Sequence, residues 1–205
     1  MTKVKICGVT NVADAISAVE VGCDLIGLNF VPHSSRFLSF NKAEKIASEI
    51  ASEVEIVAVF ANASSSDVDR AIQEMPIDYV QFHGDEQADW CNQFSKPYIK
   101  AIPIEDMSEN PANVQTFAEA FALLLDSRSE GQFGGTGKVF DWNLWPSKAE
   151  SKLILAGGLS PNNVAEAIRI CKPYAVDVAS GVEKVKGKKD SQLMQKFMEE
   201  VRRIG

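Results

Sequence analysis

Two side chains capable of acid–base chemistry stand at the ends of strand-like runs far apart in the chain. Cys7 ends the apolar run 4–7 and precedes Gly8, and Asp126 closes the apolar run 121–125. A thiol acts as a general base when nearby positive charge favours its thiolate, and a carboxyl group can act as a general acid. The pair predicts proton removal and proton donation on one substrate. The alternatives are a buried core thiol and a carboxylate that caps a helix or anchors a loop.

Glycines after two further runs predict an anion site. Gly157 and Gly158 follow the seventh run, and Ser180 and Gly181 follow the eighth. Backbone N–H groups at glycine are unshielded, and the start of a helix favours an anion, so we expect phosphate here rather than simple tight turns. Gly135 lies in the glycine-rich segment 131–138, which we expect to contact substrate or to form a lid or surface loop.

Three more polar side chains follow other runs. Arg36 could hold a carboxylate through two parallel hydrogen bonds, or be a solvated arginine. His83 could contact substrate or bond only to backbone. Asp177 could orient a polar substrate group or satisfy loop amides.

The elements that must position these residues alternate along the chain. Apolar runs separated by amphipathic segments favour repeated βαβ units and a parallel sheet. The expected strands are 4–7, 25–30, 56–60, 79–82, 98–102, 121–125, 153–156 and 175–178. The expected helices include 11–22, 41–50, 64–75, 85–94, 113–120, 160–171 and 191–203, with caps at Asn11, Asn41, Ser64, Asp85 and Ser160.

This count predicts an α/β fold, one (β/α)8 TIM barrel, with residues 1–205 as a single domain. A doubly wound open sheet would alternate similarly. The barrel is favoured because the count reaches eight and the polar residues recur at the ends of strands, where a barrel gathers them at one mouth.

Composition excludes several partners. The 21 basic and 28 acidic residues give a net charge of −7, which argues against nucleic acid and membrane surfaces as partners. Four cysteines without a C-x-x-C pair and two histidines suggest neither a zinc site nor disulfides, so we expect no metal and no cofactor. The start of the chain lacks the apolar core of a signal peptide, so a cytoplasmic protein is expected.

In combination these segments resemble the phosphoribosylanthranilate isomerase family of tryptophan biosynthesis. The matching segments are 5–10, 35–36, 80–84, 124–127, 134–137, 140–142, 155–159 and 177–183. They span nearly the whole chain in order. Ser35 and Ala179 depart from the family pattern, which more often has Pro and Ser there.

The resemblance implies an Amadori rearrangement without metal or redox cofactor. N-(5'-phosphoribosyl)anthranilate would become 1-(2-carboxyphenylamino)-1-deoxyribulose 5-phosphate. Asp126 would protonate the furanose ring oxygen, Cys7 would remove the proton from ribose C2, and Arg36 would hold the anthranilate carboxylate. Phosphate would bind at Gly158, Ser180 and Gly181. The partner would be a small phosphosugar, and the protein a monomer or homodimer.

Two other function classes stay open from the residues. A lyase or epimerase acting on another sugar phosphate would use the same glycine loops, with a lysine such as Lys5 or Lys100 at the inner strands. A non-catalytic phosphate-binding barrel would leave the placement of Cys7 and Asp126 unexplained. The related histidine-pathway aminoaldose, which carries a second phosphate, stays open as a second substrate.

Overall fold

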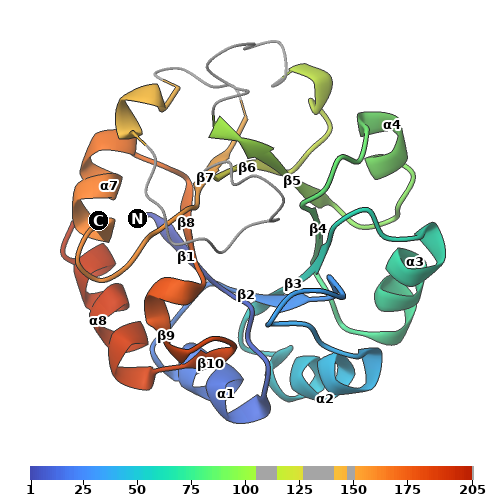
Figure 1. Ribbon diagram of the computed structural model, residues 1–205, viewed down its shortest axis with the longest axis horizontal. Coiled ribbons are helices and arrows are strands. Elements are labelled where there is room, and N and C mark those ends of the chain that lie inside the picture. The colour runs from blue at the N-terminus through green and yellow to red at the C-terminus, as the bar shows by residue number, and fades with distance from the viewer. Residues whose placement is uncertain (105–114, 127–140, 147–150, 205) are drawn as a thin grey trace.

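The eight predicted strands form a closed parallel barrel in the computed structural model (Figure 1). The structure describes residues 1–104, 115–126, 141–146 and 151–204. Each strand pairs in parallel with the next, and β8 closes on β1, with Lys5 opposite Asp177. The strands are β1 Lys3–Cys7, β2 Leu25–Asn29, β3 Glu55–Phe60, β4 Tyr79–Phe82, β5 Tyr98–Pro103, β6 Ala122–Asp126, β7 Leu153–Leu155 and β8 Ala175–Val178. The TIM-barrel prediction is confirmed.

Helices cover the outside of the barrel between successive strands (Figure 1). They are α1 Val12–Glu20, α2 Phe40–Ile50, α3 Ser65–Glu74, α4 Ala88–Cys91, α7 Val164–Cys171 and α8 Ser191–Arg202. The predicted caps Asn11 and Ser64 are confirmed, because their side chains accept hydrogen bonds from the backbone N–H groups of Asp14 and Asp67.

Three predicted helix starts are wrong. Ser39, not Asn41, precedes α2, and α4 is a single turn that begins after Gln87 rather than after Asp85. The Asp85 backbone N–H instead bonds to Asn62, which ties this loop to the one after β3. Ser160 begins a turn, and α7 starts only after Asn163. The helix expected near 113–120 lies partly outside the described residues.

Alternation along the strands divides the core into two layers. Side chains on one face, such as Leu25, Val57 and Leu124, fill the barrel interior. Those on the other face, such as Ile26 and Leu123, pack against the helices. Both faces of the sheet are buried, which is why the strands read as nearly continuous apolar runs. The interior is a packed core that supports the residues above it at the mouth.

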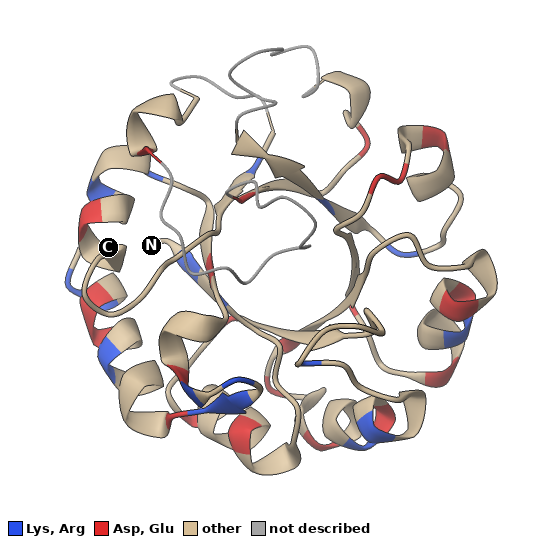
Figure 2. Cartoon of the chain, in the orientation of Figure 1, with Lys and Arg blue, Asp and Glu red and all other residues tan. Residues whose placement is uncertain are grey.

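A short hairpin follows β8 that the sequence did not predict. The 3-10 helix η2 (Ser180–Val182) leads into β9 Glu183–Val185, which pairs antiparallel with β10 Lys188–Lys189. Figure 2 shows that several residues of this hairpin are basic. Another 3-10 helix, η1, spans Trp142–Leu144.

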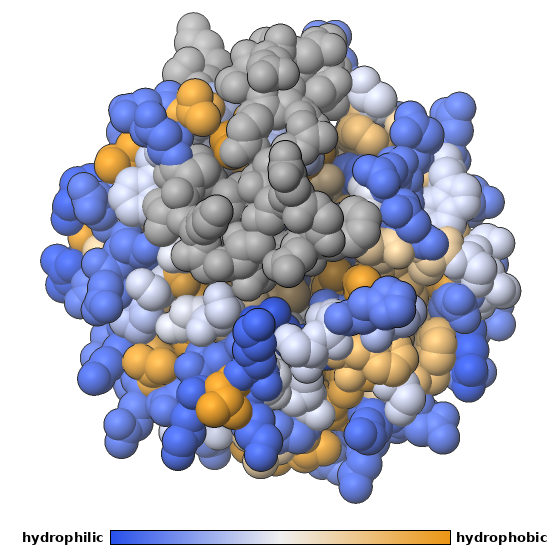
Figure 3. All heavy atoms as spheres, in the orientation of Figure 1, coloured by the Kyte–Doolittle hydropathy of each residue, from blue (hydrophilic) through white to orange (hydrophobic). Residues whose placement is uncertain are grey.

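Polar side chains dominate the described rim of the face in Figure 3, with apolar side chains scattered between them. Among the described residues, no helix is long and apolar enough to cross a membrane.

Candidate active site

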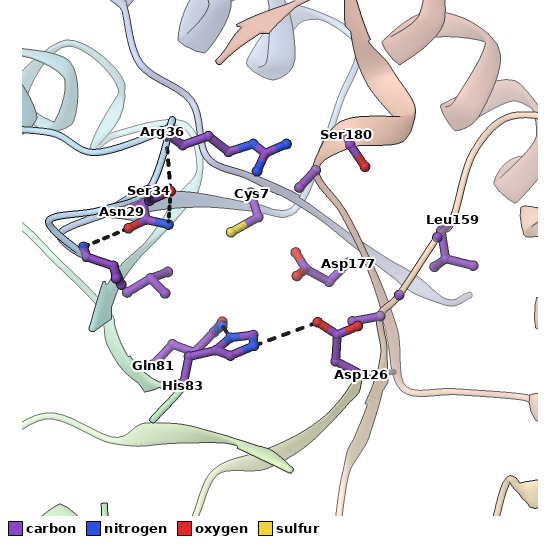
Figure 4. Close-up of a pocket in the computed structure, with 16 residues that line it drawn as sticks. Cys7, Asn29, Ser34, Arg36, Gln81, His83, Asp126, Leu159, Asp177 and Ser180 are labelled. Atoms are coloured by element: carbon purple, nitrogen blue, oxygen red, sulfur yellow. Dashed lines mark hydrogen bonds and ion pairs between the residues drawn. The ribbon is translucent and has the colours of Figure 1, made fainter. Parts of the chain in front are cut away.

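A pocket opens at the carboxyl ends of the strands, where most of the predicted site residues meet (Figure 4). Eight of the residues predicted from the sequence line it: Cys7, Arg36, His83, Asp126, Gly157, Gly158, Asp177 and Ser180. Asn29, Ser34 and Gln81 also line it. The barrel therefore brings together residues from β1, β4, β6 and β8 and from the loops after β2, β7 and β8. Gly135 lies outside the described residues.

Cys7 ends β1 with its sulfur pointing into this pocket (Figure 4). Burial raises the pKa of the Cys7 thiol, and the ammonium groups of Lys5 and Lys189 offset this only in part. The positive charge that a thiolate base requires is present, but desolvation outweighs it. The free protein therefore holds Cys7 mainly as the thiol at neutral pH.

Asp126 ends β6 and also points into the pocket, facing His83 (Figure 4). The His83 Nε2 atom lies 3.7 Å from an Asp126 carboxylate oxygen. On its other side, the His83 Nδ1 atom lies 3.0 Å from the Gln81 amide nitrogen. The Gln81 amide nitrogen is a donor, so the His83 Nδ1 atom accepts this bond and the Nε2 atom faces Asp126. The His83 ring thus contacts two side chains, while its backbone N–H donates to the Phe60 carbonyl at 2.8 Å.

Arg36 forms a two-pronged salt bridge, here called the Arg36 clamp, with Glu183, which lies 147 residues further along the chain. Its Nε and Nη2 atoms donate to the two oxygens of Glu183 at 2.6 and 2.8 Å. The Lys189 ammonium group also donates to Glu183, at 3.1 Å. Arg36 is therefore not a solvated arginine. Its stem lies over Gly8, where an added Cβ would come within 2.2 Å of the Arg36 Cδ atom.

The electrostatics of this clamp favour the charged state of both partners. Burial alone would raise the pKa of Glu183, but the hydrogen bond from Arg36 and the charge of Lys189 hold it below its usual value. The hydrogen bond to Glu183 raises the pKa of Arg36. An ionised, bidentate pair fixes the orientation of the guanidinium plane at the pocket wall.

Asp177 forms an ion pair with Lys5 at 3.0 Å inside the barrel, and no amide of the described loops bonds to its side chain. The Lys5 side chain is fully buried, whereas Asp177 is partly open to the pocket. Burial would lower the pKa of Lys5, but the negative charge of Asp177 and the hydrogen bond to it raise the pKa above its usual value. Lys5 is therefore a permanently charged ammonium group beneath the pocket floor.

The loops after β7 and β8 have the backbone geometry expected of an anion site. Gly157 and Gly158 have φ angles of 85° and 63°, a region that side chains disfavour. The Asn163 side chain donates to the Gly158 carbonyl at 2.9 Å and holds the turn in place. Gly181 packs against the other loop, since a Cβ there would lie 1.9 Å from the Leu159 carbonyl oxygen. The two loops therefore touch, and Ser180 is exposed toward the pocket between them.

Sequence reasoning missed the roles of Glu183 and Lys189. Glu183 stands in a segment that matched the family, but nothing in its spacing linked it to Arg36. Lys189 is almost completely buried, with its ammonium group 2.6 Å from the Cys7 carbonyl oxygen. Lys189 lies in β10, a strand of the hairpin that the sequence did not predict.

Comparison with known proteins identifies the family. A family model described as N-(5'phosphoribosyl)anthranilate (PRA) isomerase matches residues 4–200. The N-(5'-phosphoribosyl)anthranilate isomerase of Nitrosococcus oceani is 44% identical over 197 residues, which cover 96% of each chain.

Solved structures agree with this match. The crystal structure of phosphoribosyl anthranilate isomerase from Thermotoga maritima has a TM-score of 0.90 and 34% identity, covering 98% of this chain and 99% of that one. A further isomerase structure, in complex with reduced 1-(o-carboxyphenylamino)-1-deoxyribulose 5-phosphate, has a TM-score of 0.82 and 33% identity, covering 98% and 99%. The chain therefore belongs to the N-(5'-phosphoribosyl)anthranilate isomerase family.

Proposed function

We propose that this chain isomerises N-(5'-phosphoribosyl)anthranilate to 1-(2-carboxyphenylamino)-1-deoxyribulose 5-phosphate in tryptophan biosynthesis, with Asp126 as acid and Cys7 as base. The reaction is that of the family to which the chain belongs. The observation that carries the assignment of residues is that a carboxyl group and a thiol line one pocket together with glycine loops suited to an anion. A small phosphosugar is the matching class of substrate.

Asp126 performs the first step as general acid. Its carboxyl proton passes to the furanose ring oxygen, the bond from that oxygen to C1 breaks, and the nitrogen lone pair forms an iminium at C1. His83 lies beside the carboxyl group and contributes to positioning it. A positioned acid of this kind contributes roughly 10²- to 10⁴-fold in rate.

Cys7 performs the second step as general base. Its thiolate removes the proton from ribose C2, and the C–H electron pair neutralises the iminium to give an enolamine. The enolamine then takes a proton at C1 and loses the one on its C2 hydroxyl oxygen, which leaves the ketone. The iminium makes the C2 proton acidic enough for a thiolate to remove it.

Binding groups surround these two residues. Arg36, held by Glu183, faces the anthranilate carboxylate, and the backbone N–H groups of Gly158 and Gly181 with the Ser180 hydroxyl hold the phosphate. We assign Gly157 to the same phosphate loop, and Asp177 and Gly135 to substrate contact, the last by family resemblance alone.

The alternative function, a lyase or epimerase acting on another sugar phosphate, requires a lysine that is free to react with the substrate. Lys5 is paired with Asp177, and Lys100 donates to Glu86 at 3.0 Å and to the Gly84 carbonyl at 2.6 Å. A nucleophilic lysine must present a free amine to the carbonyl, whereas both of these ammonium groups are occupied by buried partners. A non-catalytic barrel would not need Cys7 and Asp126 in one pocket.

The direct test is an assay with freshly prepared N-(5'-phosphoribosyl)anthranilate. Purified protein should abolish the fluorescence of the substrate and produce the ketone isomer, which has the same mass and is identified by chromatography against its borohydride-reduced derivative. A folded protein that leaves the substrate unchanged would refute the proposal.

Three further properties belong to this proposal. We infer that residues 1–205 form one domain, since β8 closes on β1. A cytoplasmic location suits the four free, buried cysteines, because a reducing compartment keeps thiols free. A monomer or homodimer is expected, and sedimentation equilibrium that gave a larger assembly would contradict this.

A further inference from the structure

Lys5 is a buried charge that the proposed acid–base steps do not use. Its side chain is 0% exposed, in the barrel interior two residues before Cys7 on the same face of β1. Its ammonium group donates to Asp177 at 3.0 Å, and its charge is coupled to the Cys7 side chain. Burying a lysine costs several kcal/mol unless charged partners compensate, so such a residue needs a reason to be retained.

The neighbouring strand leaves room for this contact. Gly27 of β2 lies opposite Cys7 in the register of the sheet. A Cβ atom at Gly27 would come within 2.7 Å of the Cys7 sulfur and 3.2 Å of the Lys5 nitrogen. The absence of a side chain at Gly27 thus lets sulfur and ammonium share one space inside the barrel.

Four charged groups act on the Cys7 sulfur. Lys5 from β1 has the largest effect among them and favours the thiolate, and Lys189 from β10 acts in the same direction. Asp177 from β8 opposes them. Arg36, from the loop after β2, is close enough for its own charge to be coupled to Cys7. Among these four groups, Lys5 is the cation whose ammonium group shares the space beside Gly27 with the Cys7 sulfur, beneath the pocket.

We propose that Lys5 is the positioning residue that makes Cys7 a usable base, by donating a hydrogen bond to its thiolate from a space that Gly27 leaves open. Lys5 keeps its own proton throughout and touches no substrate atom. Asp177 holds the ammonium group in place and keeps Lys5 protonated. This inference rests on the proposed function only in naming Cys7 as the base.

The test is a pH titration of Cys7 that does not depend on turnover. Thiolate formation is followed by ultraviolet absorbance, with a Cys7→Ser protein subtracted as the blank. The Cys7→Ser blank keeps Cys23, Cys91 and Cys171, whose pKa values burial raises to about 12, so the difference between the two titrations reports Cys7 alone. Lys5→Met should move the Cys7 midpoint to higher pH, whereas Asp177→Asn should move it to lower pH.

Activity should follow the titration of Cys7. For each unit by which the midpoint rises in Lys5→Met, kcat/KM at neutral pH should fall about tenfold, because the thiolate fraction falls tenfold. The alkaline end of the pH profile should recover part of this loss. Lys100→Met is the matched control, since Lys100 is another buried lysine in an ion pair, with Glu86, and should leave the Cys7 midpoint unchanged.

Lys5→Met leaves Asp177 as an unpaired carboxylate and could prevent folding. The double variant Lys5→Met/Asp177→Asn removes both charges, and its midpoint should still lie above that of the wild type, because the effect of Lys5 exceeds that of Asp177. A Cys7 midpoint that did not move in either variant would overturn the inference about Lys5. Wild-type turnover by Cys7→Ser would instead overturn Cys7 as the base, so the two failures are distinct.

Discussion

Glu183→Gln tests whether the Arg36 clamp organises the pocket. Gln has nearly the shape of Glu but no charge, and its amide NH2 group would face one of the Arg36 donors that now bond at 2.6 and 2.8 Å. Both Arg36 and Lys189 would lose their anionic partner inside the protein. Removing one member of a buried ion pair costs about 3–5 kcal/mol.

Two measurable effects follow from this substitution. A loss of that size lowers the melting temperature by about 6–20 °C, since 1 kcal/mol corresponds to about 2–4 °C in a domain of this size. A released Arg36 side chain must also be ordered by the substrate, which costs about 1.5–2 kcal/mol of rotamer entropy. KM should therefore rise about 10- to 30-fold with kcat nearly unchanged, as expected when an interaction common to ground and transition state is lost.

The matched control is Glu200→Gln. Glu200 accepts from Arg203 at 2.6 Å, but this pair lies on the surface of α8 and should contribute about 0–1 kcal/mol. Steady-state kinetics and calorimetry on both variants separate a structural clamp from an ordinary surface pair. A Glu183→Gln protein with the KM and melting temperature of the Glu200→Gln control would refute the reasoning.

Other perturbations probe the loops and the charge state. Gly181→Ala places a methyl group 1.9 Å from the Leu159 carbonyl oxygen, so the loops after β7 and β8 must separate. The KM for the substrate and the inhibition constant of inorganic phosphate should therefore both rise. Unchanged values would argue against the phosphate site. Ser180→Ala should raise KM by about 10- to 150-fold, the range expected for one hydrogen bond to a charged group, with urea unfolding unaffected. Because the folded-state pKa of Glu183 is held below its unfolded value of about 4.3, its stabilising contribution is present above that pH and is lost as the pH falls through the folded-state pKa. The free energy of unfolding should thus fall more steeply in acid for the wild type than for Glu183→Gln, and parallel curves would contradict this.

The barrel was predictable because its strands are short apolar runs that end in polar residues. Parallel strands covered by helices leave a strong apolar signal, and the carboxyl ends of all eight strands meet at one mouth. Cys7, Asp126 and Asp177 could be placed there from their positions alone. The short α4 was not predictable, since Asp85 has the chemistry of a cap but is used to tie two loops together.

Partners that are distant in sequence were the part that could not be predicted. Nothing local links Arg36 to Glu183 or Lys5 to Asp177, because barrel closure creates both contacts. A thiolate base requires nearby positive charge, but the sequence named no residue for it, and the structure supplies Lys5 and Lys189. The structure also shows that burial raises the Cys7 pKa by more than these two lysines lower it, and no sequence pattern expresses this balance.

The division of labour between Asp126 and Cys7 is tested most directly by a kinetic isotope effect. With substrate deuterated at ribose C2, Cys7→Ser should lose roughly 10²- to 10⁴-fold in kcat and show a large primary isotope effect, because C2 proton removal becomes limiting. Asp126→Asn should lose a similar factor with an isotope effect near unity, because ring opening precedes proton removal. Near wild-type turnover by either variant, or the larger isotope effect in Asp126→Asn, would contradict the assignment.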